Sequence, residues 1–231
     1  MLDILKAIDF TPFLLSFKLA SVVTFILFIL SLPLAWYLSQ TRSRAKPLLE
    51  AITALPIVLP PSVLGFYILY ALSQHSLIGE FFQAYLGVKL VFNFTGLVIA
   101  SCFYSLPFMV QPMQSGFESL NKNMIEASYI SGKSKIQTLF KIALPNIKPS
   151  LMTALIVTFA HTVGEFGVVL MVGGSIPNQT KVASVAIYEM VENLDYTSAH
   201  VYSAIMVSIS FLVLLGAYIF NGKQNSKFNR L

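Results

Sequence analysis

Five apolar stretches constrain this chain more than any other feature of its sequence. They cover residues 13–38, 51–72, 94–113, 151–172 and 201–220. A helix rises about 1.5 Å per residue, so about 20 residues cross the hydrocarbon core of a bilayer, which is about 30 Å thick. Hydrophobic residues make up 56% of the chain and charged residues only 11%. The sequence therefore predicts an all-α integral membrane protein, with about five transmembrane helices in one lipid-embedded domain over residues 1–231.

Basic residues gather on one side of the predicted spans. The loops after the first, third and fifth stretches hold eleven Lys and Arg residues, and the opposite side holds three, Lys6, Lys89 and Lys181. Cytoplasmic loops carry the excess of Lys and Arg, so we expect residues 118–148 and the C-terminus in the cytoplasm and the N-terminus outside. The same clustering explains the net charge of +5 without a nucleic-acid partner.

The two intervals on the opposite side are expected to be outer loops. Residues 75–93 carry little charge. In residues 175–199, Val185, Tyr188 and Glu189 have the spacing of a short helix. These intervals would face the solution outside the membrane.

The second apolar stretch is interrupted by Pro56, Pro60 and Pro61. Proline removes a backbone donor and clashes with the preceding helical turn. Unpaired carbonyl groups cannot face lipid, so we expect this break to face protein or a water-filled cavity. A simple kink in a continuous helix is the alternative.

The central loop, residues 118–148, is the longest polar and basic interval. Its pattern predicts two short helices, because Asn123 with Glu126 and Ser134 with Gln137 have the spacing of capping boxes. Gly132 stands where the first helix must stop, since glycine adopts the left-handed conformation without steric cost. The second helix should carry one apolar stripe and close at Pro145. The stripe consists of Ile136, Leu139, Phe140 and Ala143.

The chain lacks the residues that an enzyme of this size would need. Gly132-Lys133-Ser134 matches the end of a phosphate-binding loop, but the required first glycine is replaced by Ala127 and no strand precedes it. The single Cys102 excludes an intrachain disulfide and a cysteine-built metal site. We therefore expect no catalytic residue, cofactor or metal in this chain, and energy would come from another subunit.

Glu165 is a carboxylate inside the fourth apolar stretch, within Gly164-Glu165-Phe166-Gly167. A charge in a bilayer is expensive and is a functional candidate by default. We hypothesise that Glu165 turns into the protein or toward an interface between subunits. There it would accept hydrogen bonds from His161, one helical turn away, or from backbone freed by the second-stretch prolines. An uncharged packing residue is the alternative. Gly164 and Gly167 would let a neighbouring helix approach closely.

The central loop resembles the EAA motif of ABC importer permeases. The match is Glu126-Ala127-Ser128, then Gly132, then Ile142-Ala143-Leu144-Pro145, and it departs only at Ser128, where the family usually has alanine. The resemblance implies a pair of coupling helices that dock on a cytoplasmic ATPase subunit. An ordinary amphipathic helix at the membrane surface is the alternative. The residues assigned to coupling are Glu126, Ala127, Ser128, Gly132, Lys133, Leu139, Ile142, Leu144 and Pro145.

Three further segments resemble permeases for molybdate and sulfate. They are Gly164 to Gly167, Gly174-Ser175-Ile176-Pro177-Asn178-Gln179-Thr180, and Leu55-Pro56-x-x-Leu59-Pro60-Pro61. This resemblance implies a type I ABC importer-like fold, a pathway between two copies of the chain, two ATPase subunits and an extracytoplasmic oxyanion-binding protein, all at the inner membrane of a prokaryote. The residues assigned to the pathway or to a polar core are Pro56, Pro60, Pro61, His161, Gly164, Glu165 and Gly167.

Molybdate is the preferred substrate, because the short chain with five predicted spans resembles the molybdate branch. A tungstate or sulfate permease is the first alternative. A secondary transporter or channel that acts alone is the second, and internal repeats would favour it. The sequence shows no clear repeat.

Overall fold

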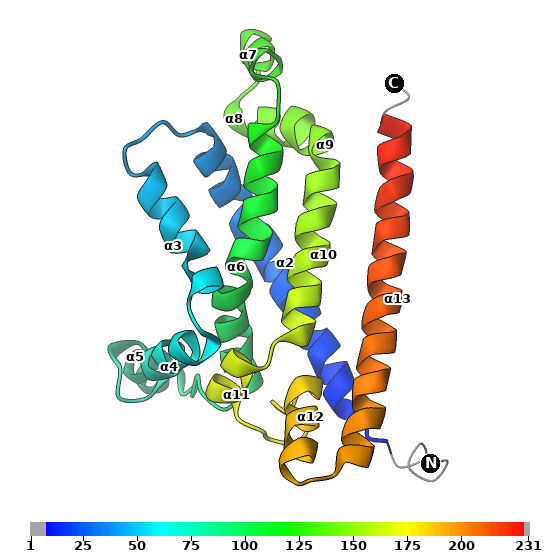
Figure 1. Ribbon diagram of the computed structural model, residues 1–231. Helices are drawn as coiled ribbons and strands as arrows, with labels where there is room; N and C mark the ends of the chain where they lie inside the picture. The colour runs from blue at the N-terminus through cyan, green and yellow to red at the C-terminus, as the bar shows by residue number, and fades with distance from the viewer. Residues whose placement is uncertain (1–7, 229–231) are drawn as a thin grey trace.

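The computed structural model describes residues 8–228, which fold into helices with no strand among them. Lys6 and Arg230, two of the basic residues used above to orient the chain, lie outside this range. Figure 1 shows the helices as a bundle with short helices at both ends. In chain order the helices are α2 (Thr11–Gln40), α3 (Lys46–Val58), α4 (Pro61–Leu72), α5 (Leu77–Leu86), α6 (Phe94–Glu118), α7 (Lys122–Ile130), α8 (Lys135–Thr138), the π-helical turn η1 (Leu139–Ala143), α9 (Leu144–Asn146), α10 (Lys148–Gly164), α11 (Gly167–Gly173), α12 (Ala183–Glu192) and α13 (Tyr196–Phe228).

Three helices are long and apolar enough to cross a membrane by themselves: α2, α6 and the first part of α13. Two pairs of helices meet the same test only when each is counted as one bent span: α3 with α4, and residues 135–146 with α10. Counting the bent pairs brings the total to five. Helix α6 extends beyond the predicted third span, residues 94–113, and α13 extends beyond the predicted fifth span, residues 201–220. The fourth apolar stretch is divided between two helices, α10 and α11, and does not form one continuous helix.

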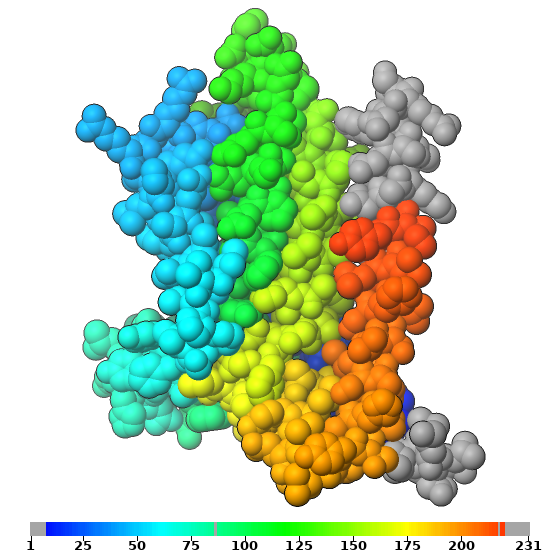
Figure 2. Space-filling model, viewed as in Figure 1, coloured from blue at the N-terminus to red at the C-terminus, as the bar shows by residue number. Residues whose placement is uncertain are grey.

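The bundle has two distinct ends (Figure 1). The central-loop helices α7, α8 and α9 lie at one end with the α2–α3 loop, and this is called the α7 end. Helices α5, α11 and α12 lie at the other, the α12 end, together with the beginning of α2. Figure 2 shows α7 projecting past the long helices and α13 along one side.

Helix α2 forms the centre of the core. Its side chains Leu19, Val23 and Leu27 are fully buried and belong to the largest apolar cluster, together with Met109 and Met113 of α6. Small residues allow the helices to approach, since a methyl group on Gly116 of α6 would lie 2.6 Å from the Ser150 Cβ of α10. Helices α2, α6 and α10 therefore form the framework that carries the central loop.

Helices α3 and α4 meet at an angle of 111°. Leu59 and Pro60 separate them, and Pro61 begins α4. Because Pro60 and Pro61 have no N–H, the carbonyl groups of Pro56 and Ile57 have no helical donor four residues later. An angle this large excludes the simple kink, and the predicted break in the second stretch is confirmed at Pro60 and Pro61. Pro56 does not interrupt the stretch, because it lies inside α3.

The two intervals predicted as outer loops each contain one complete helix, and residues 175–199 also include the start of α13. The short helix over Val185 to Glu189 is confirmed as α12. Helix α5 in residues 75–93 was missed: the Ser76 hydroxyl accepts a hydrogen bond from the Gly79 N–H at its start, and Gly87, with φ of +63°, ends it. Ser76 and Gly87 are ordinary cap residues, so the sequence did contain the signal.

Candidate functional site

The first helix of the central loop, α7, is capped two residues earlier than expected. Asn121 precedes the helix, and its side-chain oxygen accepts a hydrogen bond from the Asn123 N–H at 2.9 Å. The predicted capping box of Asn123 with Glu126 is therefore wrong. The predicted stop is confirmed, since Gly132 has a φ of +76° and follows the last turn of α7. The Lys133 N–H donates to the Ser128 carbonyl at 3.2 Å and closes this end.

The second helix begins with the predicted capping box. The Gln137 N–H donates to Ser134 Oγ at 3.2 Å, and the Ser134 N–H donates to Gln137 Oε1 at 3.0 Å. The helix does not close at Pro145, because this residue lies within the helical run of residues 135–146. Proline is tolerated near a helix start, where its missing N–H is not needed. The direction changes by 80° between residues 135–146 and α10.

The inward side of the central loop is fixed to the bundle. Ile125, Leu139 and Ala143 are buried in the same apolar cluster as α2 and α6. Ser128 and Thr138 are both buried, and their hydroxyl groups are 2.8 Å apart and hydrogen-bonded. This bond joins α7 to α8, and sequence patterns gave no signal for it because the two residues lie on different helices. The central loop is thus a bent unit whose inward side is packed against α2 and α6.

The outward side of the central loop presents large apolar side chains to the surroundings. Ile130 is 87% exposed, Ile136 71% and Phe140 57%. The expected stripe is therefore divided between two faces, since Leu139 and Ala143 are buried while Ile136 and Phe140 are not. The structure places Leu139 and Ser128, two of the predicted coupling residues, inside the fold. Ile130 was not predicted, because it lies in no helical apolar stripe.

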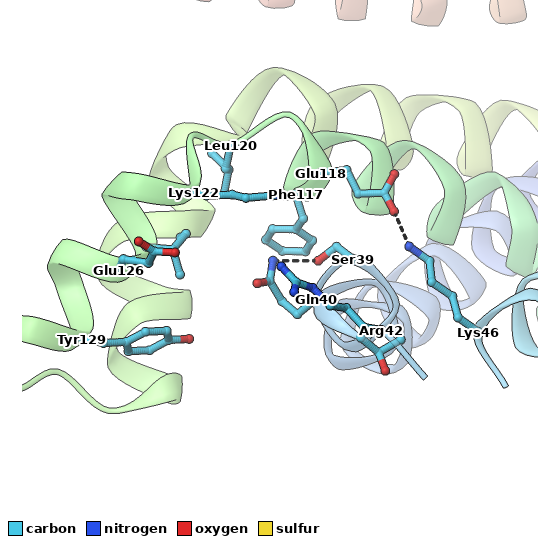
Figure 3. Close-up of a pocket in the computed structure, with 12 residues that line it drawn as sticks. Ser39, Gln40, Arg42, Lys46, Phe117, Glu118, Leu120, Lys122, Glu126 and Tyr129 are labelled. Carbon is cyan, nitrogen blue, oxygen red and sulfur yellow. Dashed lines mark hydrogen bonds and ion pairs between the residues drawn. The ribbon is translucent and has the colours of Figure 1, made fainter. Parts of the chain in front are cut away.

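A pocket of about 480 Å³ separates α7 from the end of α2 (Figure 3). Glu126 and Tyr129 of α7 line it from one side, and Gln40 and Arg42 line it from the other. Phe117, at the end of α6, also lines it. Glu126 is exposed and next to this pocket, which places it where a second molecule can reach it.

The break near Glu165 is the second candidate site. Helix α10 ends at Gly164, and α11 begins at Gly167. Glu165 is only 5% exposed, and its Oε1 accepts a hydrogen bond from the Val168 N–H in the first turn of α11 at 2.9 Å. Its backbone carbonyl accepts one from Ser184 Oγ of α12 at 2.6 Å. Glu165 therefore connects three helices at the α12 end.

His161 does not bind Glu165, and the predicted pairing is wrong. The imidazole ring packs on α6, with its centroid 3.8 Å from that of Phe108 and 4.7 Å from that of Tyr104. The carboxylate of Glu165 instead bonds a backbone N–H that becomes free only because a new helix begins after the break. Among the described residues, His161 Nε2 is buried without a hydrogen-bond partner.

The two glycines beside Glu165 play different roles. A Cβ on Gly167 would lie 2.7 Å from the Pro61 Cβ, so this glycine allows α11 to touch the start of α4. A Cβ on Gly164 would meet no heavy atom within 4 Å. The expected close approach is therefore found at Gly167 and is absent at Gly164. The break in the second stretch and the break in the fourth meet at this contact.

Comparisons with known proteins agree with these features. A family described as "Binding-protein-dependent transport system inner membrane component" matches residues 22–228. The chain is 46% identical over 211 residues to the molybdenum transport system permease protein ModB of Azotobacter vinelandii, covering 91% of this chain and 93% of that protein. It is 34% identical over 205 residues to the putative molybdenum transport system permease protein YvgM of Bacillus subtilis, covering 89% and 90%. The sulfate transport system permease protein CysT of Salmonella typhimurium is 30% identical over 186 residues, covering 80% and 67%.

Solved structures share the fold. An ABC transporter that imports the acidic polysaccharide alginate matches with a TM-score of 0.77 at 15% identity, covering 92% of this chain and 78% of that one. The MetNI methionine ABC transporter in an inward-facing conformation matches with a TM-score of 0.71 at 17% identity, covering 92% and 94%. The predicted type I ABC importer-like fold is thus confirmed. ATP hydrolysis in such importers is carried out by separate ATPase subunits, and this chain is a membrane permease subunit and no enzyme. The chain belongs to the family of binding-protein-dependent transport system inner membrane components.

Proposed function

We propose that this permease subunit imports molybdate. The observation that carries the proposal is the 46% identity, over 91% of the chain, to a molybdenum transport permease. The similarity to a sulfate permease is lower and covers less of both chains, so sulfate is the alternative substrate, together with tungstate, which has the same tetrahedral dianionic form.

The central loop is proposed as the surface that the ATPase subunit holds. Three exposed apolar side chains lie on the helical segments on either side of Gly132: Ile130 at the end of α7, Ile136 in α8 and Phe140 in η1. Exposed apolar groups on a rigid projection are suited to fill a hydrophobic groove on a partner. Among the predicted coupling residues, Leu139 and Ser128 would act indirectly, by holding the bend, while Glu126 and Lys133 would contact the partner.

We assign the α7 end to the cytoplasm. The α2–α3 loop and the central loop carry most of the basic residues in the described part of the chain, whereas Lys89 and Lys181 are the basic residues of the two outer intervals. The excess of Lys and Arg on cytoplasmic loops supports this orientation. The binding protein would then deliver its anion to the α12 end.

A second copy of the chain is proposed to complete the pathway. Helices α3 and α4 expose apolar side chains along their length, among them Leu55, Val58, Phe66 and Tyr70. The carbonyl groups of Pro56 and Ile57, which lose their helical donors at Pro60 and Pro61, need protein or water beside them. A pathway between two copies, lined by the α3–α4 break, would satisfy those groups and cover part of this apolar surface.

Reconstitution in lipid vesicles tests the proposal. The chain is combined with its ATPase and its binding protein, and uptake of molybdate, tungstate and sulfate is measured with and without ATP. We expect ATP-dependent uptake of molybdate that excess sulfate does not suppress. Uptake by the chain alone would instead support a secondary transporter or channel, and ATP-dependent uptake of sulfate in preference to molybdate would reject the substrate assignment.

A further inference from the structure

Four side chains at the α7 end join α3 to α6 in a closed polar network. Lys46 Nζ lies 3.0 Å from Glu118 Oε1 and 3.6 Å from Glu50 Oε1. Gln114 Nε2 donates to the same Glu118 oxygen at 3.0 Å and to Glu50 Oε1 at 2.6 Å. Figure 3 shows the contact between Lys46 and Glu118 at the edge of the pocket. These residues are called the Lys46–Glu118 network below.

Both charges of the ion pair stand at unfavourable ends of their own helices. Lys46 is the first residue of α3, where the helix dipole is positive, and Glu118 is the last residue of α6, where it is negative. Each charge interacts favourably only with the dipole of the neighbouring helix. Lys46 lies near the negative end of α6, and Glu118 lies near the positive end of α3. The two charges are thus placed to hold the helices together and do not stabilise either helix alone.

Helix α3 is only partly packed into the bundle. Of its 13 residues only Thr53 and Pro56 are buried, while Leu48, Ile52 and Val58 are exposed. In the described part of the chain, the ion pair of Lys46 with Glu118 is the one ion pair that joins two helices. Leu49, in the first turn of α3, packs in part against the main apolar cluster, and the network adds the polar contacts that join this end of α3 to α6.

The network stands between the central loop and the broken helix. Glu118 ends α6, and α7 begins four residues later at Lys122. On the other side, α3 leads to the 111° bend at Pro60, and Pro61 touches Gly167 beside the break at Glu165. If α7 is displaced and moves the end of α6, the contact between Glu118 and Lys46 would move α3 as well, and with it the bend between α3 and α4.

We propose that Lys46, Glu118 and Gln114 are positioning residues that make α3 move with α6, so that movement of the central loop reaches the α3–α4 bend. This inference rests on the proposed function, in which the ATPase holds the central loop. Without the network, ATP hydrolysis would continue but would move the bend less effectively. The quantity that reports the network is therefore the number of anions imported per ATP hydrolysed.

The experiment measures this ratio in vesicles that contain the chain, its ATPase and its binding protein. Lys46→Met and Glu118→Met should each lower the ratio by about two- to fivefold, in line with the strength of partly exposed ion pairs. The double variant should be no worse than either single variant, because removing one partner already abolishes the interaction. Gln114→Leu, which changes no charge, should lower the ratio in the same direction.

Arg44→Met is the matched control, since it removes one positive charge from the same loop and Arg44 forms no ion pair among the described residues. It should leave the ratio unchanged. Hydrogen exchange of the chain alone gives a second readout, in which the amides of α3 should exchange faster in Lys46→Met than in Arg44→Met. Melting temperatures identify any variant that fails to fold.

The outcomes separate the two proposals. A wild-type assembly that imports no anion with ATP would overturn the proposed function. A working assembly in which Lys46→Met and Arg44→Met have the same ratio, or in which the single effects multiply in the double variant, would overturn the role of the network alone.

Discussion

Gly132 provides the sharpest test of the central loop, because its substitution separates backbone strain from steric contact. Its φ of +76° lies in the left-handed region, and a Cβ there would meet no heavy atom within 4 Å. A Cβ at this position therefore collides with nothing in the chain, and the cost of an alanine is conformational. For an alanine that cost is about 1–2 kcal/mol, and a β-branched valine is less tolerated still.

We expect this strain to weaken binding of the ATPase. If the partner binds only the bent form, a cost of about 1–2 kcal/mol lowers the apparent affinity by about 5- to 30-fold, because each 1.4 kcal/mol is a factor of ten. The assay titrates the ATPase against the purified chain in lipid nanodiscs and compares Gly132→Asn, Gly132→Ala and Gly132→Val. Asparagine tolerates the left-handed conformation better than other non-glycine residues, so affinity should fall in that order.

The order of the affinities of the three variants distinguishes backbone strain from a steric clash. A steric clash with the partner would make the larger asparagine worse than alanine, whereas backbone strain makes it better. An alanine variant that binds as tightly as the wild type, or an asparagine variant that is weaker than alanine, would refute the strain argument.

Three other predictions concern the α12 end and are each checked by the melting temperature of the purified chain. Gly167→Val should destabilise the chain by about 1–3 kcal/mol, because a proline of α4 occupies the space, while Gly164→Val, in open surroundings, should change little. Glu165→Leu should cost about 0.5–2 kcal/mol as a lost helix cap, whereas Glu165→Gln keeps an oxygen acceptor and should retain most of the stability; equal losses would mean that the charge itself matters. Burial raises the pKa of Glu189, but the hydrogen bonds of Lys181 and Ser175, with the charge of Lys181, together outweigh this and hold that pKa below its usual 4.5. Its contribution is therefore present above about pH 4.5 and lost as the pH falls through the lower folded value, and Lys181→Met should flatten this acid-side decline.

Features that depend on neighbouring residues could be predicted from the sequence. The Ser134 capping box and the stop at Gly132 need only a few consecutive residues, and both are confirmed. The break at Pro60 was predictable for the same reason. The cap of α7 was misplaced because Asn121 and Asn123 are both suitable cap residues, and the choice between them depends on where α6 ends.

Features that depend on packing between distant helices could not be predicted. The sequence around Glu165 allows a partner on the same helix, His161, and only the end of α10 at Gly164 shows that the carboxylate reaches the next helix instead. Likewise Gly164 and Gly167 are equivalent in the sequence, but only one of them faces α4. The hydrogen bond between Ser128 and Thr138 could be predicted only if the bend between α7 and α8 and the burial of both side chains were already known.

The π-helical turn over Leu139–Ala143 has a consequence for the evolution of the central loop. In this turn the Leu144 N–H donates to the Leu139 carbonyl, five residues back, so the turn holds one residue more than an α-helical turn. Deleting any one of these residues would rotate Ile136 by about 100° around the helix axis relative to α10. A sequence shortened at Phe140 or Lys141 would keep Gly132 and the run from Ile142 to Pro145 and still aim its apolar groups in a different direction. The number of residues between Gly132 and Ile142 therefore determines the rotation of this helix about its axis, and insertions or deletions in this segment should be tolerated far less well than substitutions.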